Sequence, residues 1–493
     1  MRARSTWLQW LTLAVLGLFA ATYLVVATTR IIYPFDLDFI EDDVLVEAWR
    51  FAQGLPVFVA PNADFVPHAY APLYMLLSAG LFKLDGVGFR SMRALSFAAT
   101  LATGFMLYWA GQRVSHQRAT ALLAPGLFLA GYSLTGAEYE LARVDALFVM
   151  FVVVGTLVGI VGSMSRRSVA FSALCLALAF FTKQTGLIFG VGMAGYLLST
   201  QRKQAGLFCV VFALAVLLPL GVMDRATGGW STTYLFAVPA NDPIVASRIT
   251  DFVRSDLLRH LGPLCVLWLA TLIVSWRMPA HTNPLTRAWL WFALLALLDS
   301  GWMRARLGGN ANSLMPAYTF LCLLPVLALR ELPLTFADRA LGRIVCGGVY
   351  LAVLAQCALG VYNPLADVPS TAMQQSGQRL IQRIAQMPGP VLVLEHPYYA
   401  LLAGKPPGVS LTALWHARGR GAEPLPADLI QRIHDQYYAA IIGDDGEYAE
   451  VEAEVDALIA ATYTNTMRLN DGDAPPTLSG VIVRPAVVFT RKN

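Results

Sequence analysis

Long apolar segments recur along this 493-residue chain until about residue 361, and they constrain its fold more than any other feature. Each segment holds roughly 15 to 22 residues, which is the length of a helix that crosses a lipid bilayer. Only 14% of the residues are charged, whereas soluble globular domains carry about 25%. The sequence therefore predicts a mainly α-helical protein that crosses a membrane several times.

Eleven spanning helices are expected in this region. They are predicted at residues 7–28, 94–111, 119–135, 145–163, 168–182, 184–200, 205–222, 261–276, 287–300, 314–329 and 343–361. The first follows the basic segment MRARST and is expected to be retained, because it is too long for a signal peptide and lacks a small-residue cleavage site. Residues 69–84 are apolar but short and contain a proline, so they either span the membrane or lie at its surface.

The distribution of positive charge decides between these two arrangements. Most arginine and lysine residues between the helices lie in five short loops, GQRVSHQR, SMSRRS, STQRKQ, RMPAHTNPLTR and RELPLTFADRALGR. Cytoplasmic loops are enriched in these residues, and all five share the side of the basic N-terminus only if residues 69–84 do not span. We therefore expect a cytoplasmic N-terminus, with the first outer loop (29–93) and the C-terminal region outside the membrane.

The C-terminal region has a different pattern from the rest of the chain. Amphipathic segments alternate with short runs of β-branched and apolar residues, as in GPVLVLEHP, YYAAIIGDD and GVIVRPAVVFTRK. Helices that alternate with strands indicate a small α/β domain. We therefore expect a membrane domain (1–361) followed by an extracytoplasmic α/β domain (362–493).

Composition and motifs argue against several classes of function. The net charge is only +4 and no basic aromatic stripe is present, so a nucleic-acid partner is not expected. All six cysteines fall within apolar segments, which argues against a disulfide framework, and their spacing does not suggest a metal site. No Walker loop, dinucleotide fingerprint, HExxH or GxSxG motif occurs in a suitable context. No cofactor is therefore expected, and nothing in the sequence indicates a metal.

Three adjacent carboxylates, Glu41, Asp42 and Asp43, follow the first predicted span in the stretch FIEDDVLVEAWRFAQG. The apolar residues after them have helical spacing, which predicts a helix lying on the outer membrane surface. Acidic residues favour a helix N-terminus through capping and the helix dipole. Alternatively, one of them faces a polar cavity and acts as a general base on an incoming hydroxyl group. The sequence leaves both roles open.

Four further stretches place polar residues on the same outer face: FVPHAYAPLYMLL, GAEYELARVDALFVMF, LAFFTKQTGLIFG and GWMRARLGGNANS. The first is either a surface anchor or part of a site, and the second either marks the end of a span or lines a polar cavity. Cations in the last two either reach for water or bind an anionic, lipid-linked substrate. The candidate substrate-binding residues are His68, Tyr70, Glu138, Arg143, Asp145, Lys183, Arg304, Arg306, Asn310 and Asn312.

The order of these motifs resembles that of the GT-C integral-membrane glycosyltransferases. In that family an acidic pair in the first outer loop precedes a Pro-Pro-Leu element and an Arg-x-x-Ser-Ala-Leu helix start. Here EDD (41–43), YAPLY (70–74) and FRSMRALSF (89–97) stand at these places, and KQT and GGNANSLMPAY are also similar. Over about residues 1–330 the chain is most similar to the bacterial branch related to protein O-mannosyltransferases and the lipid A aminoarabinose transferase. The tail stretch VLVLEHPYYALLAGKPP resembles the exported C-terminal domain of the family.

This resemblance implies an inverting glycosyltransferase of the bacterial inner membrane. It would move a sugar from a polyprenyl-phosphate donor to a hydroxyl group of a cell-envelope glycan, lipid or protein, with a first-loop carboxylate as the base. Lys183, Arg304 or Arg306 would stabilise the departing lipid phosphate. The acids are Glu-Asp-Asp rather than Asp-Glu, which leaves the identity of the base open, and Ala-Pro replaces Pro-Pro, which leaves the acceptor site open.

Two other classes of function compete with this hypothesis. A transporter or a flippase for lipid-linked sugars would need charged groups near the membrane midplane, whereas the polar residues gather on one rim. An envelope binding protein would use the α/β domain for partners without catalysis. Convergence of residues 41–43 and Lys183 in one outward cavity would favour the transferase.

Overall fold

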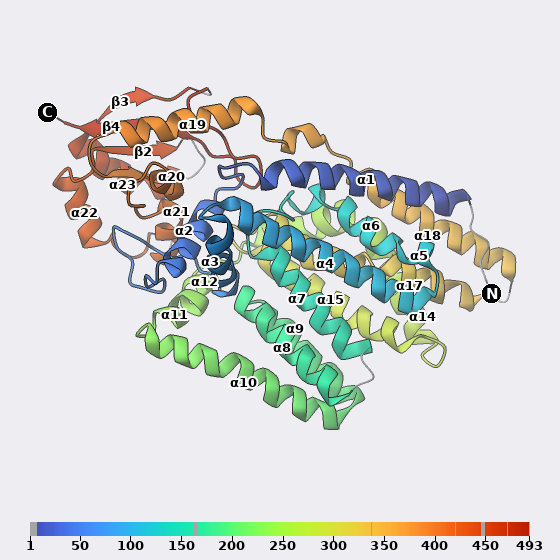
Figure 1. Cartoon of the computed structure of the whole chain (residues 1–493). Coiled ribbons are helices and arrows are strands. Elements are labelled where there is room, and N and C mark those ends of the chain that lie inside the picture. The colour runs from blue at the N-terminus through green and yellow to red at the C-terminus, as the bar shows by residue number, and fades with distance from the viewer. Residues whose placement is uncertain are drawn as a thin grey trace.

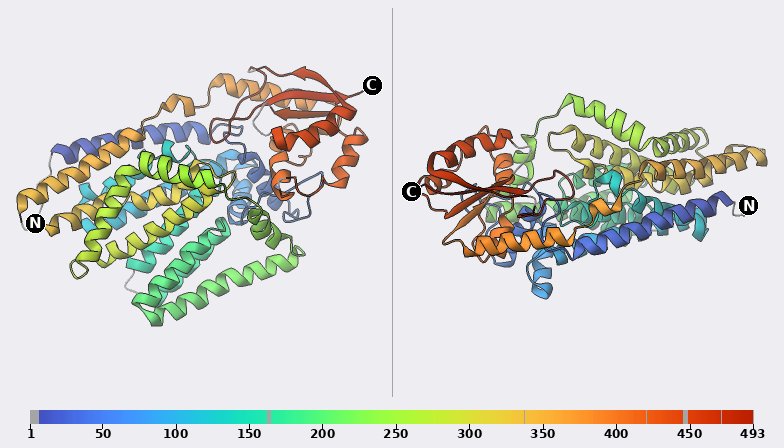
Figure 2. Two further views of the ribbon diagram at one scale, coloured as in Figure 1. Left: turned by 180° about the vertical axis from the view of Figure 1, so that it is seen from behind. Right: turned by 90° about the horizontal axis from the view of Figure 1, so that it is seen from above.

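Long helices form an elongated bundle, and a small α/β region covers one end of it (Figure 1). The computed structural model describes residues 7–161, 165–336, 338–419, 421–444, 449–470 and 472–492. The N-terminus lies at the end of the bundle opposite the α/β region in every view (Figures 1 and 2). The expected fold class, a helical membrane bundle with a small C-terminal α/β domain, is confirmed. The domain boundary at residue 361 stays a prediction.

Each predicted span coincides with one or more helices. The bundle helices are α1 (Trp7–Ile31), α4 (Phe89–Ser115), α5 (Arg118–Ala121), α6 (Leu123–Ala130), α7 (Asp145–Val161), α8 (Arg166–Thr182), α9 (Gly186–Thr200), α10 (Arg202–Ala226), α14 (Gly262–Arg277), α15 (Pro284–Ala305), α16 (Met315–Leu321), α17 (Leu324–Glu331) and α18 (Arg339–Leu359). Among the described residues, 5 helices are long and apolar enough to cross a membrane, or 6 if one bent pair forms a single span. The other bundle helices are not counted by this test, so the number of eleven spans stays a prediction.

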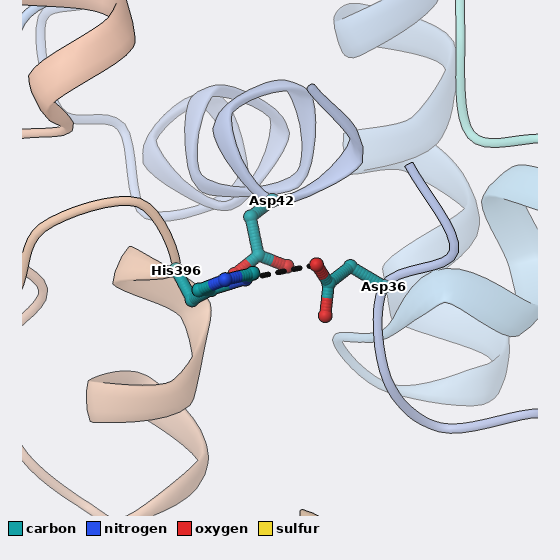
Figure 3. Close-up of side chains that lie close together, drawn as sticks. All are labelled: Asp36, Asp42 and His396. Atoms are coloured by element: carbon teal, nitrogen blue, oxygen red, sulfur yellow. Dashed lines mark ion pairs between the residues drawn. The ribbon is translucent and has the colours of Figure 1, made fainter. Parts of the chain in front are cut away.

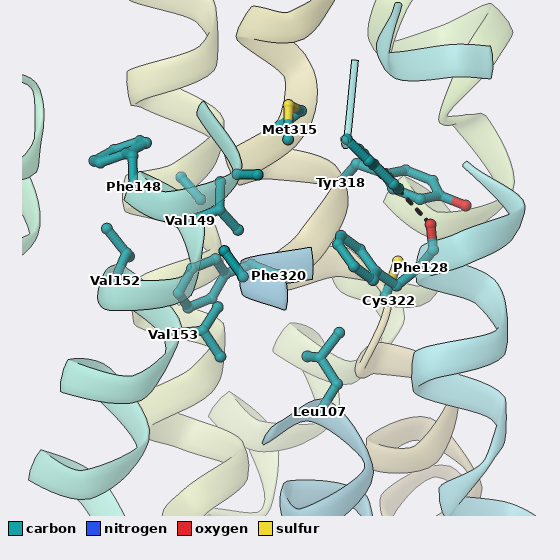
Figure 4. Packing of buried hydrophobic residues seen from close by; sticks show 14 of the residues in the cluster. Leu107, Phe128, Phe148, Val149, Val152, Val153, Met315, Tyr318, Phe320 and Cys322 are labelled. Atoms are coloured by element: carbon teal, nitrogen blue, oxygen red, sulfur yellow. Dashed lines mark hydrogen bonds between the residues drawn. The ribbon is translucent and has the colours of Figure 1, made fainter. Parts of the chain in front are cut away.

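The most deeply buried span is divided between α16 and α17. Pro325 lies in the first turn of α17, where its missing N–H group is tolerated, whereas its ring disfavours a continuous helix. Phe148 of α7 and Phe320 of α16 belong to one hydrophobic cluster (Figure 4). Trp289 of α15 stacks on Phe320 at 4.6 Å and donates its indole N–H to the Phe320 carbonyl oxygen at 2.7 Å. This packing holds α7, α15 and α16 together below the polar residues at their outer ends.

The first outer loop contains two helices, α2 (Glu41–Ala52) and α3 (Leu73–Asp85). Most of residues 69–84 belongs to α3, which has 13 residues. At the rise of an α-helix this is roughly 20 Å, shorter than the hydrocarbon core of about 30 Å. The length of α3 therefore agrees with the expected position at the membrane surface.

Residues 223–260 connect the predicted spans 205–222 and 261–276 and contain several short helical pieces. The segment contains α11 (Trp230–Thr232), α12 (Val238–Ala240) and α13 (Ala246–Asp251), with π-helical turns at Thr233–Ala237 and Phe252–His260. From Ala246 to His260 the helical turns run without a break. The last turn meets α14 at a bend of 89°.

The C-terminal region forms a four-stranded sheet in the order β1-β2-β4-β3. Strand β1 (Val391–Val393) pairs in parallel with β2 (Ala440–Asp444), and β4 (Pro485–Arg491) pairs antiparallel with both β2 and β3 (Tyr463–Arg468). The helices are α19 (Thr371–Gln386), α20 (Pro397–Leu402), α21 (Leu411–Ala417), α22 (Ala427–His434) and α23 (Ala449–Thr462), and short 3₁₀ turns occur at Ser133–Thr135, Ala311–Leu314, Leu332–Thr335 and Pro364–Asp367. The three predicted strands and three predicted helices are present, whereas β3, α20 and α21 were not predicted.

Described residues of three basic loops lie near the N-terminal end of the bundle. Helices α5, α14 and α17 have ends there (Figure 1), and the Arg330 guanidinium donates a hydrogen bond to the Val114 carbonyl oxygen at 2.8 Å. This grouping agrees with the expected topology. The orientation of the bundle in a membrane stays a prediction.

Candidate active site

Helix α2 lies between the bundle and the α/β region and carries the three adjacent carboxylates in its first turn (Figure 1). The Asp38 carboxylate accepts a hydrogen bond from the Ile40 N–H at 3.1 Å just before the helix begins. Glu41 and Asp42 are 0% exposed and Asp43 is 4% exposed. The expectation that this triplet faces an open polar cavity is therefore wrong, because neighbouring chain segments cover it.

Glu41 is fully occupied by structural hydrogen bonds. The Arg93 Nε and Nη2 atoms donate to its two oxygens at 2.8 and 2.6 Å. The backbone N–H groups of Leu37 and Ala142 donate to the same carboxylate at 2.7 and 2.6 Å. A carboxylate offers about four acceptor sites, so Glu41 has none left for a substrate.

The partner of Glu41 belongs to a buried group of two cations and two anions. Arg93 donates its other N–H groups to three backbone carbonyl oxygens of residues 30–35, at 2.7 to 2.9 Å. The Arg30 Nε atom lies 2.6 Å from a Glu140 oxygen. Arg30, Glu41, Arg93 and Glu140, which we call the paired cluster, are all 0% exposed. Because its charges balance, the paired cluster joins the outer ends of α1, α2 and α4 and offers no free charge to a ligand.

Asp42 has a different environment from Glu41. It lies beside His396 and Asp36 (Figure 3), and neither of its oxygens accepts a hydrogen bond from the described residues. Burial raises the pKa of Asp42 well above its usual value, and the negative charge of Asp36 raises it further.

Asp43 contacts the segment between α2 and α3. Its Oδ2 atom lies 3.1 Å from His68 Nε2 and accepts a hydrogen bond from the Ser410 hydroxyl at 3.0 Å. Glu47, one turn further along α2, accepts a hydrogen bond from the His68 backbone N–H at 2.6 Å. The His68 ring stacks on Tyr70 with their centroids 5.4 Å apart. Helix α2 thus positions both aromatic rings beside Asp43.

Lys183 lies at the turn between α8 and α9, next to the same segment. Gln184 donates a hydrogen bond to the Ala69 carbonyl oxygen at 2.6 Å, which fixes this turn beside His68 and Tyr70. The Lys183 ammonium donates to Asp145 Oδ1 at 2.7 Å. We call Asp43, His68, Tyr70, Asp145 and Lys183 the outer polar cluster.

Two further candidates extend the outer polar cluster. Asn312 donates a hydrogen bond to the second oxygen of Asp145 at 3.2 Å. Arg143 donates to Asp38 at 2.7 Å, and its Nε atom lies 3.2 Å from Glu138 and 3.5 Å from Asp145. Burial raises the pKa of Glu138 well above its usual value; Arg143 opposes this effect and the neighbouring carboxylates add to it.

A polar cavity of about 590 Å³ adjoins this extension. Glu138, Arg304 and Asn310 are among the residues that line it. Neither the carboxylates at positions 41–43 nor Lys183 line this cavity.

Arg304 and Arg306 make their contacts with the 223–260 segment rather than with Lys183. Arg304 Nε lies 2.8 Å from Asp256 Oδ2, and Arg306 donates to the Pro239 carbonyl oxygen. The reason lies in the backbone, because residues 305–307 pair with residues 243–245 and turn both side chains toward the 223–260 segment.

A second cavity of about 610 Å³ is mainly apolar. Its lining includes Phe51 at the end of α2, Pro72 and Leu76 around α3, and Met223 and Trp230 at the end of α10 and in α11. Pro72 lies two residues after Tyr70, so this cavity begins close to the outer polar cluster.

Several buried polar residues were not among the sequence candidates. Asp36 and Asp38 precede the triplet in the stretch DLDF, and His396 and Asp444 stand at the C-terminal ends of β1 and β2. Parallel strands bring such ends to the same edge of a sheet. That pattern was available in the sequence, whereas the approach of His396 to Asp36 joins residues 360 positions apart and leaves no local signal.

Comparisons with known proteins agree with this architecture. Residues 68–222 match the family model of dolichyl-phosphate-mannose-protein mannosyltransferases. The structure of ArnT from Cupriavidus metallidurans in the apo state matches with a TM-score of 0.60 and 15% identity, covering 96% of this chain and 97% of that one. The same protein bound to undecaprenyl phosphate matches with a TM-score of 0.59 and 14% identity, covering 96% and 97%. A search of curated proteins found no match.

A more distant structure has the same fold. The oligosaccharyltransferase of Archaeoglobus fulgidus in the apo form matches with a TM-score of 0.53 and 12% identity, covering 92% of this chain and 73% of that one. The resemblance expected from the sequence is confirmed at the level of the fold, and the chain is a multi-pass membrane protein with the architecture of the GT-C glycosyltransferases.

Proposed function

We propose that the protein transfers a sugar from a polyprenyl-phosphate donor to an acceptor hydroxyl group at the outer face of the bacterial inner membrane. The observation that carries this proposal is the outer polar cluster, in which a carboxylate and a cation from distant helices adjoin one short segment. The fold supports it as well, because ArnT has this fold and was crystallised with undecaprenyl phosphate. The acceptor would be a glycan, lipid or protein of the cell envelope.

Asp43 is the proposed general base. Of the triplet, Glu41 is saturated by hydrogen bonds and Asp42 is buried with a raised pKa. Asp43 is the most exposed of the three at 4%, and it lies beside the His68 ring. Asp43 would accept the proton of the acceptor hydroxyl group while the oxygen attacks the anomeric carbon of the donor sugar. The bond from that carbon to the phosphate oxygen breaks, and the polyprenyl phosphate leaves.

Lys183 and Arg143 are the proposed contacts of the donor phosphate. Lys183 gives one of its three N–H donors to Asp145, so two donors remain for phosphate oxygens. Arg143 Nε makes no hydrogen bond to the described residues although Glu138 lies nearby. Both cations could therefore stabilise the charge that develops on the leaving phosphate.

The apolar cavity beside α3 is the proposed site of the isoprenoid chain. Its lining by Phe51, Leu76, Met223 and Trp230 suits a hydrocarbon chain. Pro72 belongs to both the cavity lining and the segment that carries Tyr70, so a lipid here would have its phosphate near Lys183.

The proposal is tested with purified protein in lipid vesicles and a panel of radiolabelled polyprenyl-phosphate sugars. A transferase releases free polyprenyl phosphate and moves the label to a cell-envelope acceptor extract. Movement of intact donor across the vesicle membrane without cleavage of the sugar–phosphate bond would instead identify a flippase and reject the proposal.

The proposed orientation has a separate test by cysteine labelling in a background without the native cysteines. His116→Cys, at the end of α4, should be protected from an impermeant reagent added outside the cell. Tyr437→Cys, whose wild-type side chain is exposed in the α/β region, should react. The opposite result would place the outer polar cluster in the cytoplasm.

A further inference from the structure

Three buried side chains from distant parts of the chain converge beside the first turn of α2. Asp36 precedes the helix, Asp42 lies in it, and His396 follows β1 (Figure 3). One potential ligand atom from each lies within 4.8 Å of the other two. Their exposed fractions are 2%, 0% and 0%.

Asp36 and His396 each form a hydrogen bond with a neighbouring residue through one polar atom. The other polar atom of each side chain points to the centre of the group. The Tyr399 hydroxyl donates to Asp36 Oδ1 at 2.5 Å, which leaves Oδ2 on the inner side. The His396 Nε2 atom lies 2.8 Å from Asp444 Oδ2, which leaves Nδ1 on the inner side. Histidine ligands of metals typically donate their second N–H to a carboxylate, and carboxylate ligands are themselves hydrogen-bonded.

The third side chain has no such neighbour. Neither oxygen of Asp42 accepts a hydrogen bond from the described residues, although both are buried. The His396 Nδ1 and Asp36 Oδ2 atoms form an ion pair at 2.8 Å. Buried polar atoms without partners are strongly unfavourable, and the Asp42 carboxyl group lies beside this ion pair (Figure 3).

The charges of this group are not balanced by the protein. The carboxyl groups of Asp36, Asp42 and Asp444 adjoin a single imidazole, so even a protonated His396 would neutralise only one of three negative charges. A buried group of this kind needs a further cation or must take up protons.

We propose that Asp36, Asp42 and His396 bind a divalent transition-metal ion, with Zn²⁺ as the expected ion. Atoms bound to one Zn²⁺ ion at about 2.0 to 2.2 Å lie at most about 4.4 Å apart. The His396 Nδ1 atom lies 2.8 Å from Asp36 Oδ2 and 4.0 Å from Asp42 Oδ2, and all three ligand atoms lie within 4.8 Å of one another, so small side-chain movements would bring them within this limit. One imidazole nitrogen with two carboxylate oxygens favours zinc over calcium or magnesium, which prefer oxygen ligands alone.

The ion would fasten the first outer loop to the α/β region. Asp36 and Asp42 belong to the loop, whereas His396 and its partner Asp444 belong to the C-terminal sheet. Asp43 is the next residue of α2, so the same contact would fix the orientation of that carboxylate. This inference goes beyond the proposed function and does not depend on it, because bound metal and thermal stability are measured without substrate.

The first test uses the full-length wild-type protein in detergent. Metal is removed with a chelator, zinc is returned, and the bound metal is measured by mass spectrometry after removal of the excess. We expect about one Zn²⁺ ion per chain, the number that one set of three ligands would hold. We also expect the melting temperature to fall with the chelator and to recover with zinc. Absence of both bound zinc and a thermal response would overturn the proposal without any variant.

Three variants then locate the ion. Asp42→Asn should lose the bound zinc and the thermal response, and Asp444→Asn should weaken zinc binding about 10- to 100-fold by freeing the histidine ring. Glu395→Gln is the matched control, because Glu395 is a buried carboxyl group beside His396 that bonds to Thr412 and should leave zinc binding unchanged. If no metal is bound, Asp42→Asn replaces a protonated carboxyl group with an amide and should leave the melting temperature equal or higher. That result, or stoichiometric zinc in Asp42→Asn, would contradict the proposed site.

Discussion

The Arg93–Glu41 pair of the paired cluster and the outer polar cluster lie at the same end of the bundle and both contain buried charges, yet they differ in how many of their hydrogen-bonding groups have partners. In the paired cluster, all five donors of Arg93 make hydrogen bonds and Glu41 accepts four. In the outer polar cluster, Lys183 makes one hydrogen bond, and Asp43 retains slight exposure.

This difference distinguishes residues with a structural role from residues proposed to contact the substrate, although both kinds look alike in the sequence. A saturated ion pair joins chain segments but has no donor or acceptor left for a ligand. A buried charge that lacks some of its hydrogen-bond partners destabilises the folded protein. Such a charge is better explained by a substrate that supplies the missing partners. Glu41 and Asp43, two positions apart on α2, thus receive opposite interpretations from their contacts.

The largest expected effect is on stability and comes from the paired cluster. Arg93→Met leaves Glu41 buried without its partner, which should reduce the free energy of unfolding by about 3 to 5 kcal/mol. Arg90→Met, three residues earlier on α4, is the matched control because Arg90 is exposed and lies 3.7 Å from Asp85. Chemical unfolding in detergent measures both variants. Equal stability of the two variants would show that the paired cluster is not structural.

The next effect is on donor affinity and comes from the outer polar cluster. Lys183→Ala should weaken binding of a polyprenyl-phosphate sugar by about 1.5 to 3 kcal/mol, as expected for a lost hydrogen bond to a charged group, or about 10- to 150-fold in Kd. Lys183→Arg should restore it only in part, because the guanidinium group has a different shape. Lys83→Ala at the exposed end of α3 controls for the loss of surface charge. Wild-type affinity in Lys183→Ala would remove Lys183 from the donor site.

The smallest effect is expected at Arg306, which the sequence grouped with Lys183. Arg306 covers the Trp302 ring at 4.8 Å and donates to a backbone carbonyl group outside both clusters. Arg306→Ala should therefore change the free energy of donor binding by less than about 0.5 kcal/mol, or about twofold in Kd. A loss as large as that of Lys183→Ala, measured in the same binding assay, would require Arg306 to contact the donor.

Much of the fold was predictable because the bilayer imposes a length on its helices. Every expected span contains helix, and the membrane-surface position expected for residues 69–84 agrees with the short helix α3. Strand β3 was missed because its sequence YTNTMR lacks apolar alternation, and it forms only by pairing with β4.

The sequence predicted which residues belong to the candidate site but not which partners they contact. Asp43, His68, Tyr70, Asp145 and Lys183 were all named as candidates, and they lie together. The different roles of residues 41–43 were not predictable, because each depends on contacts with residues at least 25 positions away. The local sequence shows the type of each side chain but not which distant residue forms hydrogen bonds or an ion pair with it.

The most direct test of the proposed chemistry is the turnover of Asp43→Asn at saturating donor, with Glu47→Gln as a comparison on the same face of α2. Loss of a general base lowers the rate by about 100- to 10,000-fold, so Asp43→Asn should release polyprenyl phosphate at least about 100-fold more slowly than wild type. Donor affinity and melting temperature should stay at wild-type values, and Glu47→Gln should keep most of the turnover because it only supports His68. Wild-type turnover in Asp43→Asn would contradict the assignment of the outer polar cluster as the catalytic centre.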